Sequence, residues 1–558
     1  MTGSAPLRIV IVGGVAGGAS AATRARRMNE HADIILLEKD EHVSFANCGL
    51  PYHIGGEIAD RRKLLVATRE LLQNRFRLDV RTHHEALSID RSSKTLQVRN
   101  QQADEEFSLP YDRLILSPGA SPFVPPVTGA SASGVFTLRN IADMDRILAA
   151  IDASTHRTAV VVGGGFIGLE MAEQLVHRSL KVSLAELQPH VLPMFDAEMV
   201  QPLHACLQDH GIEFCGGSGL QEILMNEQNQ ATGIRLADDR ELAGDLVILG
   251  MGVRPNTQLA QAAGLTIGST GGILTNRFLQ TSDPDIYAVG DAAEYVFGPS
   301  GQSMRVALAG PANRAGRLAG EHAATGHCQP MPNVQGTAIV RVFEQTAAMT
   351  GITVSMAPRC GLQATSVTVV AGQHAGYFPG ATPVTLKLVF DPQTGRILGA
   401  QAVGKDGVDK RIDVIATAMQ MNATVRDLAG VDLCYAPPFG SAKDPVHQAA
   451  FAACNHLDEI DIFTTVDADL SGVQLVDVRT PAEVQHAPLA GGAHAINIPV
   501  DELRSRLHEL DPNAETVVSC GVGVRAHVAI RILMQHGFRN VRNLPGGATV
   551  RNRAVCPK

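Results

Sequence analysis

Two of the nine cysteines lie where a thiol could take part in chemistry, and the first of them is Cys48. Its segment SFANCGLPY (44–52) contains a glycine and a proline that predict a turn into the start of a helix, where the helix dipole stabilises a thiolate. No second cysteine lies within five positions. A redox reaction at Cys48 must therefore carry its oxidised sulfur as a mixed disulfide, a persulfide or a sulfenate. A buried structural cysteine is the alternative.

The second is Cys520, the first residue of the loop CGVGVR (520–525). An apolar strand at residues 516–519 precedes this loop, and a helix follows it. A cysteine in such a glycine-bearing loop meets several backbone N–H groups, and Arg525 adds positive charge. The pattern predicts a site that stabilises a thiolate or a persulfide anion.

A glycine turn near the N-terminus predicts the first of two nucleotide-binding folds that must position Cys48. An apolar strand (8–12), the turn GGVAGG (13–18), an alanine-rich helix (19–28) and a second strand (33–37) lead to Glu38. The glycines let the backbone approach a pyrophosphate at a helix N-terminus, and the acid accepts hydrogen bonds from ribose hydroxyls. The expected contacts are Gly13, Gly14, Ala16, Gly17, Gly18, Glu38 and Lys39.

The same motif recurs further along the chain. A strand (159–162), the turn GGGFIG (163–168), a helix and a strand (182–185) end at Glu186. This turn matches GxGxxG fully, whereas the first has Val15 at the middle glycine. Two such units predict two dinucleotides. Glu186 would bind a ribose 2′-hydroxyl and repel a 2′-phosphate, so NADH is expected, with NADPH as the alternative. The expected contacts are Gly163, Gly165, Ile167, Gly168 and Glu186.

A third pattern completes a known arrangement. Residues 285–291 (DIYAVGD) predict a strand that ends in Gly-Asp, and the turns LSPG (116–119) and GVRP (252–255) accompany it. These segments resemble the flavoprotein disulfide reductases with two dinucleotide folds. The resemblance implies FAD, with Asp291 bonded to the flavin ribitol; a helix N-cap is the alternative for Asp291. Ser117, Gly119, Gly252 and Ala309 are the further expected cofactor contacts.

The segment SFANCGLPY is similar to the single-cysteine branch of that family, which contains coenzyme A disulfide reductases, NADH oxidases and NADH-dependent persulfide reductases. The resemblance covers residues 8–455. HAGYFPG (374–380) and YAPPFGSAKDP (435–445) match the coenzyme A group within the branch. The resemblance to the coenzyme A group implies a homodimer in which Tyr377 and Tyr435 reach the reactive sulfur of the opposite subunit. There they would donate hydrogen bonds or a proton to the leaving thiolate. Packing residues are the alternative for both tyrosines.

The resemblance also implies a coenzyme A site. Arg24 and Arg27 lie three positions apart on the first helix, so they share a face and could hold a phosphate. A solvated basic face is the alternative for these two arginines. The full set of implied coenzyme A contacts is Ser20, Arg24, Arg27, Ser44, Asn47 and Lys443.

The C-terminal part of the chain resembles a single rhodanese domain. The matching segments are DVR (477–479), NIP (497–499), the six-residue loop of Cys520 and NLPGG (543–547). An aromatic residue usually follows the last glycine pair, but this chain continues with Ala548-Thr549-Val550. The resemblance implies sulfur transfer through Cys520 and Arg525, and a purely structural module is the alternative.

Length and composition are consistent with these folds. With 558 residues the chain is too long for one core, and the motifs predict an α/β protein with two Rossmann-like domains for FAD and NAD, an α+β dimerisation domain and a rhodanese domain. The expected boundaries are 1–117 with 253–326 for FAD, 118–252 for NAD(H), 331–455 for dimerisation and 462–558 for the rhodanese domain, with a polar linker at 456–461.

Charge and cysteine pattern argue against several classes of partner. The net charge of -9 argues against a nucleic-acid partner, and no apolar run is long enough for a membrane span. The odd number of cysteines and the absence of CxxC suit a reducing cytoplasm and predict neither disulfides nor a thiolate metal site.

Four functions remain open from the sequence. We expect reduction of coenzyme A persulfide or polysulfide at Cys48, because a rhodanese module has no obvious use for a plain disulfide. Coenzyme A disulfide reduction, an NADH oxidase or peroxidase through a Cys48 sulfenate, and a non-catalytic sulfur carrier or redox sensor are the alternatives. The fused domain further suggests that Cys520 collects sulfane sulfur and passes it through coenzyme A to Cys48.

Overall fold

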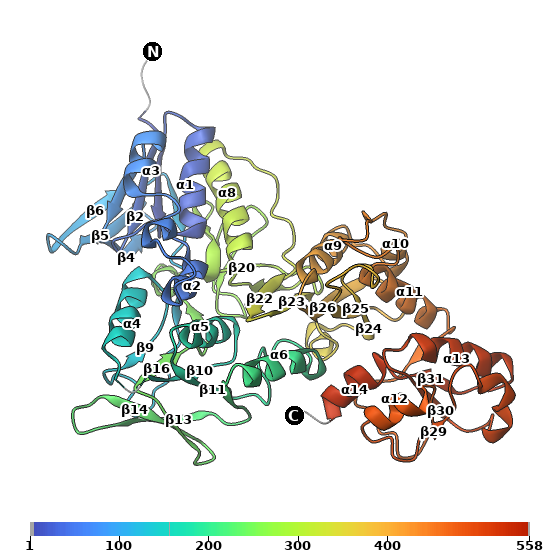
Figure 1. Cartoon of the computed structure of the whole chain (residues 1–558). Helices are drawn as coiled ribbons and strands as arrows, with labels where there is room; N and C mark the ends of the chain where they lie inside the picture. Colours follow the sequence, from blue (N-terminus) through green and yellow to red (C-terminus); the bar gives the residue numbers. More distant parts are fainter. Residues whose placement is uncertain (1–4, 156, 556–558) are drawn as a thin grey trace. The chain divides into compact units, whose positions relative to one another are not determined.

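The structure is a computed structural model that describes residues 5–155 and 157–555. It divides into two compact units, residues 1–187 with 215–336 and residues 188–214 with 337–558 (Figure 1). Both units contain helices and strands, as the sequence predicts. No described helix is both long and apolar enough to cross a membrane.

A parallel sheet carries the N-terminal glycine turn of the first unit. Its strands, in spatial order, are β19 (Ile286–Ala288), β7 (Arg113–Leu116), β1 (Arg8–Val12), β2 (Asp33–Glu38) and β3 (Asp79–Thr82), with helices α1 (Ala16–Met28) and α8 (Ala309–Thr325). The side chains of Ile9, Val10 and Ile11 are fully buried, as in a parallel strand covered on both faces. Helices α1 and α8 approach closely, because a Cβ on Gly316 would fall 2.1 Å from the carbonyl oxygen of Gly17.

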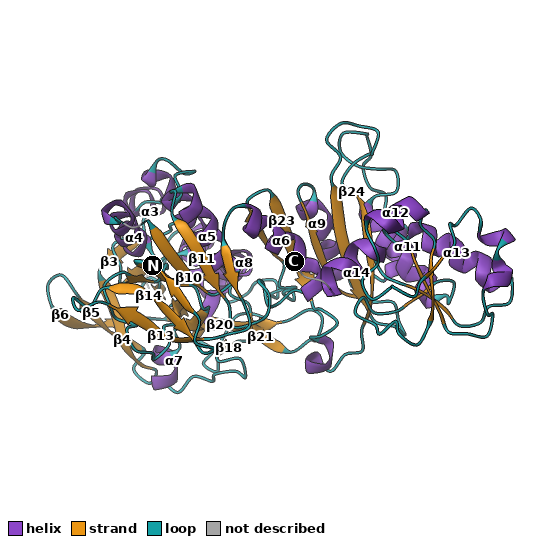
Figure 2. Cartoon of the chain, turned by 60° about the horizontal axis from the view of Figure 1, so that its bottom comes forward, coloured by secondary structure: helices purple, strands orange, loops and turns teal. Residues whose placement is uncertain are grey.

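A second parallel sheet in this unit carries the other glycine turn. It includes β11 (Lys181–Ala185), β10 (Thr158–Val162), β16 (Leu246–Leu249) and β9 (Val135–Phe136), and the helices of this part are α4 (Ile141–Ala153) and α5 (Phe166–His177). Figure 2 shows α5 alongside β10 and β11. The turn at residues 163–168 joins β10 to α5, so both dinucleotide motifs lie between a buried strand and a helix, as predicted.

The first unit also contains shorter elements, several of which lie near the nucleotide folds. They are two short helices, α2 (Leu50–Ile54) and α3 (Arg69–Phe76), the antiparallel strands β4 (His84–Asp90), β5 (Thr95–Asn100) and β6 (Glu105–Pro110), and a second antiparallel set, β13 (Leu220–Met225), β14 (Ala231–Leu236) and β15 (Glu241–Ala243). Helix α2 packs against α5, so the chain after Cys48 contacts the second nucleotide fold within one compact unit.

The second unit contains an antiparallel sheet covered by helices. In spatial order its strands are β22 (Ala338–Val342), β23 (Gln345–Gly351), β26 (Ile397–Gly404), β25 (Pro383–Phe390) and β24 (Thr365–Gly372), and the helices are α9 (Val408–Gln420), α10 (Val425–Ala429) and α11 (Pro445–Leu457). Leu386, Leu388, Ile412 and Ile415 are among the buried side chains that join the sheet to these helices. This is the α+β arrangement expected for the dimerisation domain.

Helix α6 (Ala197–Asp209) belongs to the second unit, although the expected boundaries placed it inside the NAD(H)-binding domain. The physical reason is a buried ion cluster. The Nζ atom of Lys387 lies 2.7 Å from Asp196 and 2.6 Å from Glu198, both at the start of α6. Burial alone would lower the pKa of Lys387, but the two carboxylates outweigh it and raise that pKa.

The C-terminal part of the second unit is a parallel sheet with helices. Its strands, in spatial order, are β27 (Ile462–Phe463), β31 (Val541–Asn543), β30 (Thr516–Ser519), β28 (Gln474–Asp477) and β29 (Ile496–Asn497), and its helices are α12 (Pro481–His486), α13 (Val524–Gln535) and α14 (Gly547–Val555). The expected linker is shorter than predicted, because α11 extends to Leu457. Asp461 at its end is 2% exposed and accepts a 2.9 Å hydrogen bond from the side-chain amide of Asn543.

Candidate functional site

Cys48 lies in a short 3-10 turn, Asn47–Gly49, directly before α2, which agrees with the predicted turn into a helix. Its side chain is exposed. The side-chain amide of Asn47 donates a 3.0 Å hydrogen bond to the carbonyl oxygen of Arg139 and so fixes the turn. A Cβ on Gly49 would fall 2.8 Å from Leu64, which explains why the residue after the cysteine is glycine. The turn therefore presents the thiol at the surface on a tightly packed support.

The charges around Cys48 act against the expected thiolate. Partial desolvation of the thiol raises its pKa although the side chain is exposed, and the carboxylates of Glu170 and Asp291 raise it further. Only the backbone at Cys48 and the Arg139 guanidinium lower it. Desolvation of the thiol and these two carboxylates therefore act against the thiolate that the helix start was predicted to stabilise.

Replacing Glu170 with glutamine is expected to lower the pKa of the Cys48 thiol, because it removes the stronger of the two negative charges that disfavour the thiolate. Glu170 accepts a 3.0 Å hydrogen bond from the Tyr52 hydroxyl, which an amide oxygen can also accept. The pH profile of Cys48 alkylation by iodoacetamide should shift to lower pH in Glu170→Gln. The control Glu105→Gln should leave the profile unchanged. An unchanged profile in Glu170→Gln as well would contradict the effect of Glu170 on the pKa of Cys48.

The first glycine turn has the close packing that a dinucleotide cradle needs. Gly13 has φ +94°, and a Cβ there would fall 2.0 Å from the carbonyl oxygen of Ser117. A Cβ on Gly18 would fall 1.8 Å from the carbonyl oxygen of Gly13, so the helix start lies directly against the turn. Glu38 accepts a 2.8 Å hydrogen bond from the N–H of Gly14, and burial raises the pKa of Glu38. No side chain caps the start of α1, so its N–H groups can face a pyrophosphate.

The second glycine turn repeats this geometry. A Cβ on Gly168 would fall 1.8 Å from the carbonyl oxygen of Gly163, as in the first turn. Glu186 accepts a 2.6 Å hydrogen bond from the N–H of Gly164. A Cβ on Gly165, at the start of α5, would meet no atom within 4 Å, so the backbone there faces open space that a phosphate can enter. Both turns thus fit a dinucleotide.

Asp291 pairs with Arg139 rather than capping a helix. Their closest nitrogen and oxygen atoms are 3.3 Å apart, and the pair is half-buried. Arg139 also contacts the turn of Cys48 through its carbonyl oxygen, so it connects that turn to Asp291. No local motif marks Arg139, because its partner Asp291 lies 152 residues away in the sequence. Nearby, a cavity of about 250 Å³ is lined by Lys39, Asp40, His42, Arg61, His83 and Asn140, among others.

The remaining expected cofactor contacts lie after strands or at the starts of helices in the first unit. Ser117 and Gly119 follow β7, Ala309 is the first residue of α8, and Ile167 lies in the first turn of α5. Gly252 has φ +90°, and a Cβ there would meet no atom within 4 Å. Ala16 and Gly17 begin α1.

The two tyrosine segments of the second unit come together. The hydroxyls of Tyr377 and Tyr435 are 3.0 Å apart, and this hydrogen bond raises the pKa of Tyr377. Both side chains are exposed, at 75% and 50%, so neither is a packing residue of this unit. Buried Arg411 supports both segments, since it donates hydrogen bonds to the carbonyl oxygen of Gln373 at 2.6 Å and to Asp444 at 2.7 Å.

The expected coenzyme A contacts have different surroundings. Arg24 forms a pair with Glu321, with nitrogen–oxygen distances of 2.9 and 2.5 Å, whereas the guanidinium of Arg27 lies 5.1 Å from the centre of the Phe76 ring. The two arginines therefore have separate partners rather than one shared clamp in this structure. The Ser20 hydroxyl donates a 2.6 Å hydrogen bond to Asn313. Lys443 is exposed, while Ser44 and Asn47 lie in the segment that leads to Cys48.

Cys520 lies at the carboxyl end of β30 and is 1% exposed. Its Sγ accepts a 3.1 Å hydrogen bond from the N–H of Gly523, the residue before α13. Arg525 has a partner that the sequence analysis missed, because its guanidinium pairs with Glu483 at 2.6 and 2.8 Å. That pairing lowers the pKa of Glu483 to about 2. The positive charge near Cys520 is thus already partly neutralised.

Comparison with known proteins agrees with the fold. The model of the pyridine nucleotide-disulphide oxidoreductases matches residues 7–316. The chain belongs to this family. The dimerisation domain of the same oxidoreductases matches residues 337–445, and a rhodanese-like domain matches residues 465–550. The predicted fold class and the family resemblance are therefore confirmed.

Relatives and solved structures cover most of this oxidoreductase. Coenzyme A disulfide reductase of Staphylococcus aureus (strain bovine RF122 / ET3-1) is 36% identical over 446 residues, which are 80% of this chain and 99% of that protein. The structure of reduced Bacillus anthracis CoADR-RHD superimposes with a TM-score of 0.93 at 42% identity and covers 98% of each chain. A NAD-dependent persulfide reductase from A. fulgidus gives a TM-score of 0.90 at 35% identity, covering 98% of this chain and 100% of that one.

Membership makes this protein an oxidoreductase that uses FAD and a nicotinamide dinucleotide. The residues present fit both groups, because each glycine turn has the packing described above and an acid at the end of its second strand. We assign FAD to the turn at 13–18 and the nicotinamide dinucleotide to the turn at 163–168 as an interpretation of that geometry.

Proposed function

We propose that the protein reduces the sulfane sulfur of coenzyme A persulfide or polysulfide with NADH, through Cys48. The observation that carries this proposal is the combination, in one chain, of the exposed Cys48 in the first unit, with no second cysteine near it in the sequence, and a rhodanese-like loop around Cys520. The rhodanese module supports persulfide rather than plain disulfide as the substrate. The persulfide reductase from A. fulgidus, similar over nearly the whole chain, supports the same substrate class.

The protein's own groups would act as follows. The Cys48 thiolate attacks the outer sulfur of the persulfide, an S–S bond breaks, and the coenzyme A thiolate leaves. Cys48 now carries the persulfide. Bound flavin and nicotinamide supply the two electrons that return Cys48 to its thiolate and release sulfide. Desolvation of the thiol, Glu170 and Asp291 raise the pKa of Cys48, whereas the Arg139 guanidinium lowers it and so favours the thiolate.

Coenzyme A would be held at both ends. We assign its phosphates to Arg24, Arg27 and Lys443, and the region near the sulfur to Ser44 and Asn47, which lie beside Cys48. Ser20, on the first helix, completes the set. The exposed pair Tyr377 and Tyr435 would donate a hydrogen bond or a proton to the leaving thiolate across a homodimer, and the matched dimerisation domain supports that assembly.

A direct comparison of substrates tests the proposal. NADH oxidation is measured without oxygen, with coenzyme A persulfide, coenzyme A disulfide and polysulfide in parallel, and sulfide is quantified. We expect the fastest turnover and one sulfide per NADH with the persulfide, and slower turnover when NADPH replaces NADH. Turnover with the disulfide alone would instead favour a coenzyme A disulfide reductase, which the relative from Staphylococcus aureus supports. Turnover only with oxygen would make the protein an oxidase.

Replacing Cys520 with serine is expected to reduce turnover on polysulfide while leaving turnover on preformed coenzyme A persulfide within about two-fold. The reason is that a serine hydroxyl cannot collect sulfane sulfur, whereas Cys48 still accepts the loaded carrier. The same anaerobic assay measures both rates. Cys434→Ser, an exposed cysteine outside the loop, is the matched control. Equal turnover of Cys520→Ser and wild type on every donor would contradict the transfer of sulfur from Cys520.

A further inference from the structure

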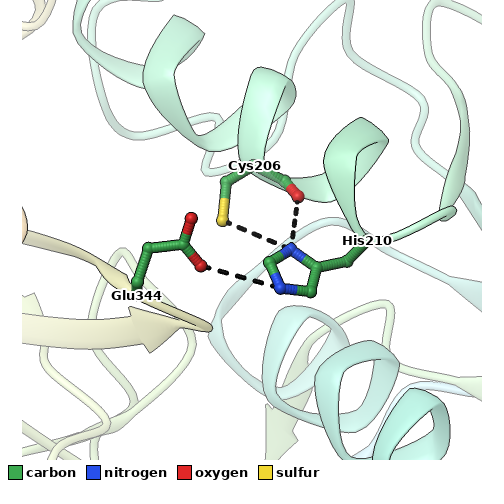
Figure 3. A group of neighbouring side chains, drawn as sticks. All are labelled: Cys206, His210 and Glu344. Atoms are coloured by element: carbon green, nitrogen blue, oxygen red, sulfur yellow. Dashed lines mark hydrogen bonds and ion pairs between the residues drawn. The ribbon is translucent and has the colours of Figure 1, made fainter.

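Three side chains with metal-binding atoms meet in the second unit, away from both reactive cysteines in the sequence. Cys206 and His210 lie four positions apart on and just after α6, so they share one helix face. Glu344 comes from the two-residue turn between β22 and β23 (Figure 3). One ligand atom from each of the three lies within 4.8 Å of the others.

The contacts within this Cys-His-Glu cluster direct their polar atoms toward one another. The Sγ of Cys206 is 3.9 Å from Nδ1 of His210, and the Nε2 of His210 is 3.7 Å from a carboxylate oxygen of Glu344 (Figure 3). The ligand atoms of a tetrahedral zinc ion, bound at about 2.0 to 2.3 Å, lie roughly 3.3 to 3.8 Å apart. The Sγ contact is to Nδ1 rather than to Nε2. An ion bound at Nε2 therefore requires the Cys206 side chain to turn toward Nε2, whereas Nε2 and the Glu344 oxygen, 3.7 Å apart, already have a separation suited to zinc.

A backbone hydrogen bond selects the tautomer of His210 that leaves Nε2 free to bind a metal. Its Nδ1 lies 2.9 Å from the carbonyl oxygen of Cys206, which can only accept, so Nδ1 carries the hydrogen in the neutral ring. The lone pair is then on Nε2, the atom that faces Glu344. A ligating histidine commonly donates its other N–H to a backbone carbonyl in this way.

The turn that supplies Glu344 is held against the histidine. Phe343 has φ +51°, a conformation that bulky residues rarely adopt. Its ring stacks on that of His210 with centres 3.7 Å apart and an angle of 5° between the planes. This stacking orients the imidazole. Cys206 is 3% exposed, while the side chains of His210 and Glu344 are 34% and 43% exposed, so an ion can enter from solvent.

We propose that Cys206, His210 and Glu344 form a Zn²⁺ site, with water at the remaining position. Thiolate, imidazole and carboxylate together suit zinc better than calcium or magnesium, which prefer oxygen ligands alone. On binding, zinc replaces the proton on the Cys206 sulfur, and one proton is released to solvent. The bound ion would fasten the end of α6 to the β22–β23 turn within the second unit.

Cobalt binding tests the site directly. The full-length protein carries Cys48→Ser and Cys520→Ser in every arm, so that the two reactive thiols do not bind the metal. Co²⁺ is titrated without oxygen, and the thiolate-to-cobalt charge-transfer band is recorded. We expect one equivalent with this band, displaced by Zn²⁺, and at least a ten-fold weaker binding in His210→Gln and in Glu344→Gln. Both substitutions are at partly exposed side chains, so the fold should persist. Cys206→Ser should lose the band.

Matched controls separate the site from adventitious binding. His31→Gln and Cys434→Ser replace exposed residues elsewhere and should bind Co²⁺ like the parent. Zn²⁺ should also raise the thermal midpoint of the parent in a concentration-dependent manner, and not that of His210→Gln. Binding of equal affinity in all variants, or cobalt without a thiolate band, would show an adventitious ion only and would overturn the proposal.

Discussion

Replacing Cys48 with serine should abolish NADH-dependent reduction of coenzyme A persulfide and of coenzyme A disulfide, with kcat lowered on the order of 10³-fold or more. A serine hydroxyl cannot form an S–S bond and is not ionised at neutral pH, so no sulfur intermediate forms. The steady-state rate of NADH oxidation and the amount of sulfide released measure the effect. The loss should be equal for both substrates, since both would react at the same sulfur.

The control must show that the serine variant keeps its cofactors. NADH should still bleach the flavin of Cys48→Ser without oxygen, because hydride transfer does not use the thiol. Cys215→Ser is a matched substitution of a buried cysteine in the same unit and should keep the wild-type rate within about two-fold. If Cys48→Ser still reduces persulfide, a residue other than Cys48 must react with the substrate, which would contradict the proposal.

Local patterns predicted the nucleotide-binding elements well. Strands β1 and β30 have the bounds expected from their apolar runs, and each glycine turn joins a strand to a helix. These features depend on neighbours in the sequence: a buried strand is continuously apolar, and a turn beside a helix start needs glycine. The sequence also placed Cys48 before a helix for the same reason.

Contacts between residues far apart in the sequence could not be predicted from such local patterns. Arg139 near Asp291 and Glu483 beside Arg525 are joined only by the fold, so no spacing rule finds them. The same holds for α6, whose start pairs with Lys387 far along the chain. The pKa of Cys48 is a similar case, since desolvation of the thiol and the carboxylate of Glu170, which is remote in the sequence, both raise it.

The Cys-His-Glu cluster shows the limit of cysteine spacing as a guide to metals. Absence of CxxC predicted no thiolate metal site, and that rule concerns ligands that are close in sequence. Cys206 and His210 are four apart on a helix, but Glu344 comes from a strand turn much later in the chain. Only a fold that packs α6 against the β22–β23 hairpin brings the third ligand into reach.

The buried pair of Arg411 and Asp444 should have the largest effect on stability. Their side chains are 1% and 4% exposed, and Asp444 also accepts a 3.1 Å hydrogen bond from the N–H of Val446 at the start of α11. Asp444→Ala leaves a buried guanidinium without its partner, and this should cost about 3 to 5 kcal/mol of unfolding free energy. The midpoint and slope of guanidinium-induced unfolding of the second unit measure the loss.

Two comparisons decide whether the charge pair is the cause. Asp458→Asn, which removes an exposed partner of Arg426 in the same unit, should cost at most about 1 kcal/mol. The double variant Arg411→Met with Asp444→Asn leaves no unpaired charge, so it should be more stable than Asp444→Asn alone. If the losses of unfolding free energy from the two single substitutions simply add in the double variant, packing rather than the ion pair determines the loss.

Since Arg411 also donates to the carbonyl oxygen of Gln373, three residues before Gly376, loss of the pair should loosen the segment that presents Tyr377 and lower kcat as well.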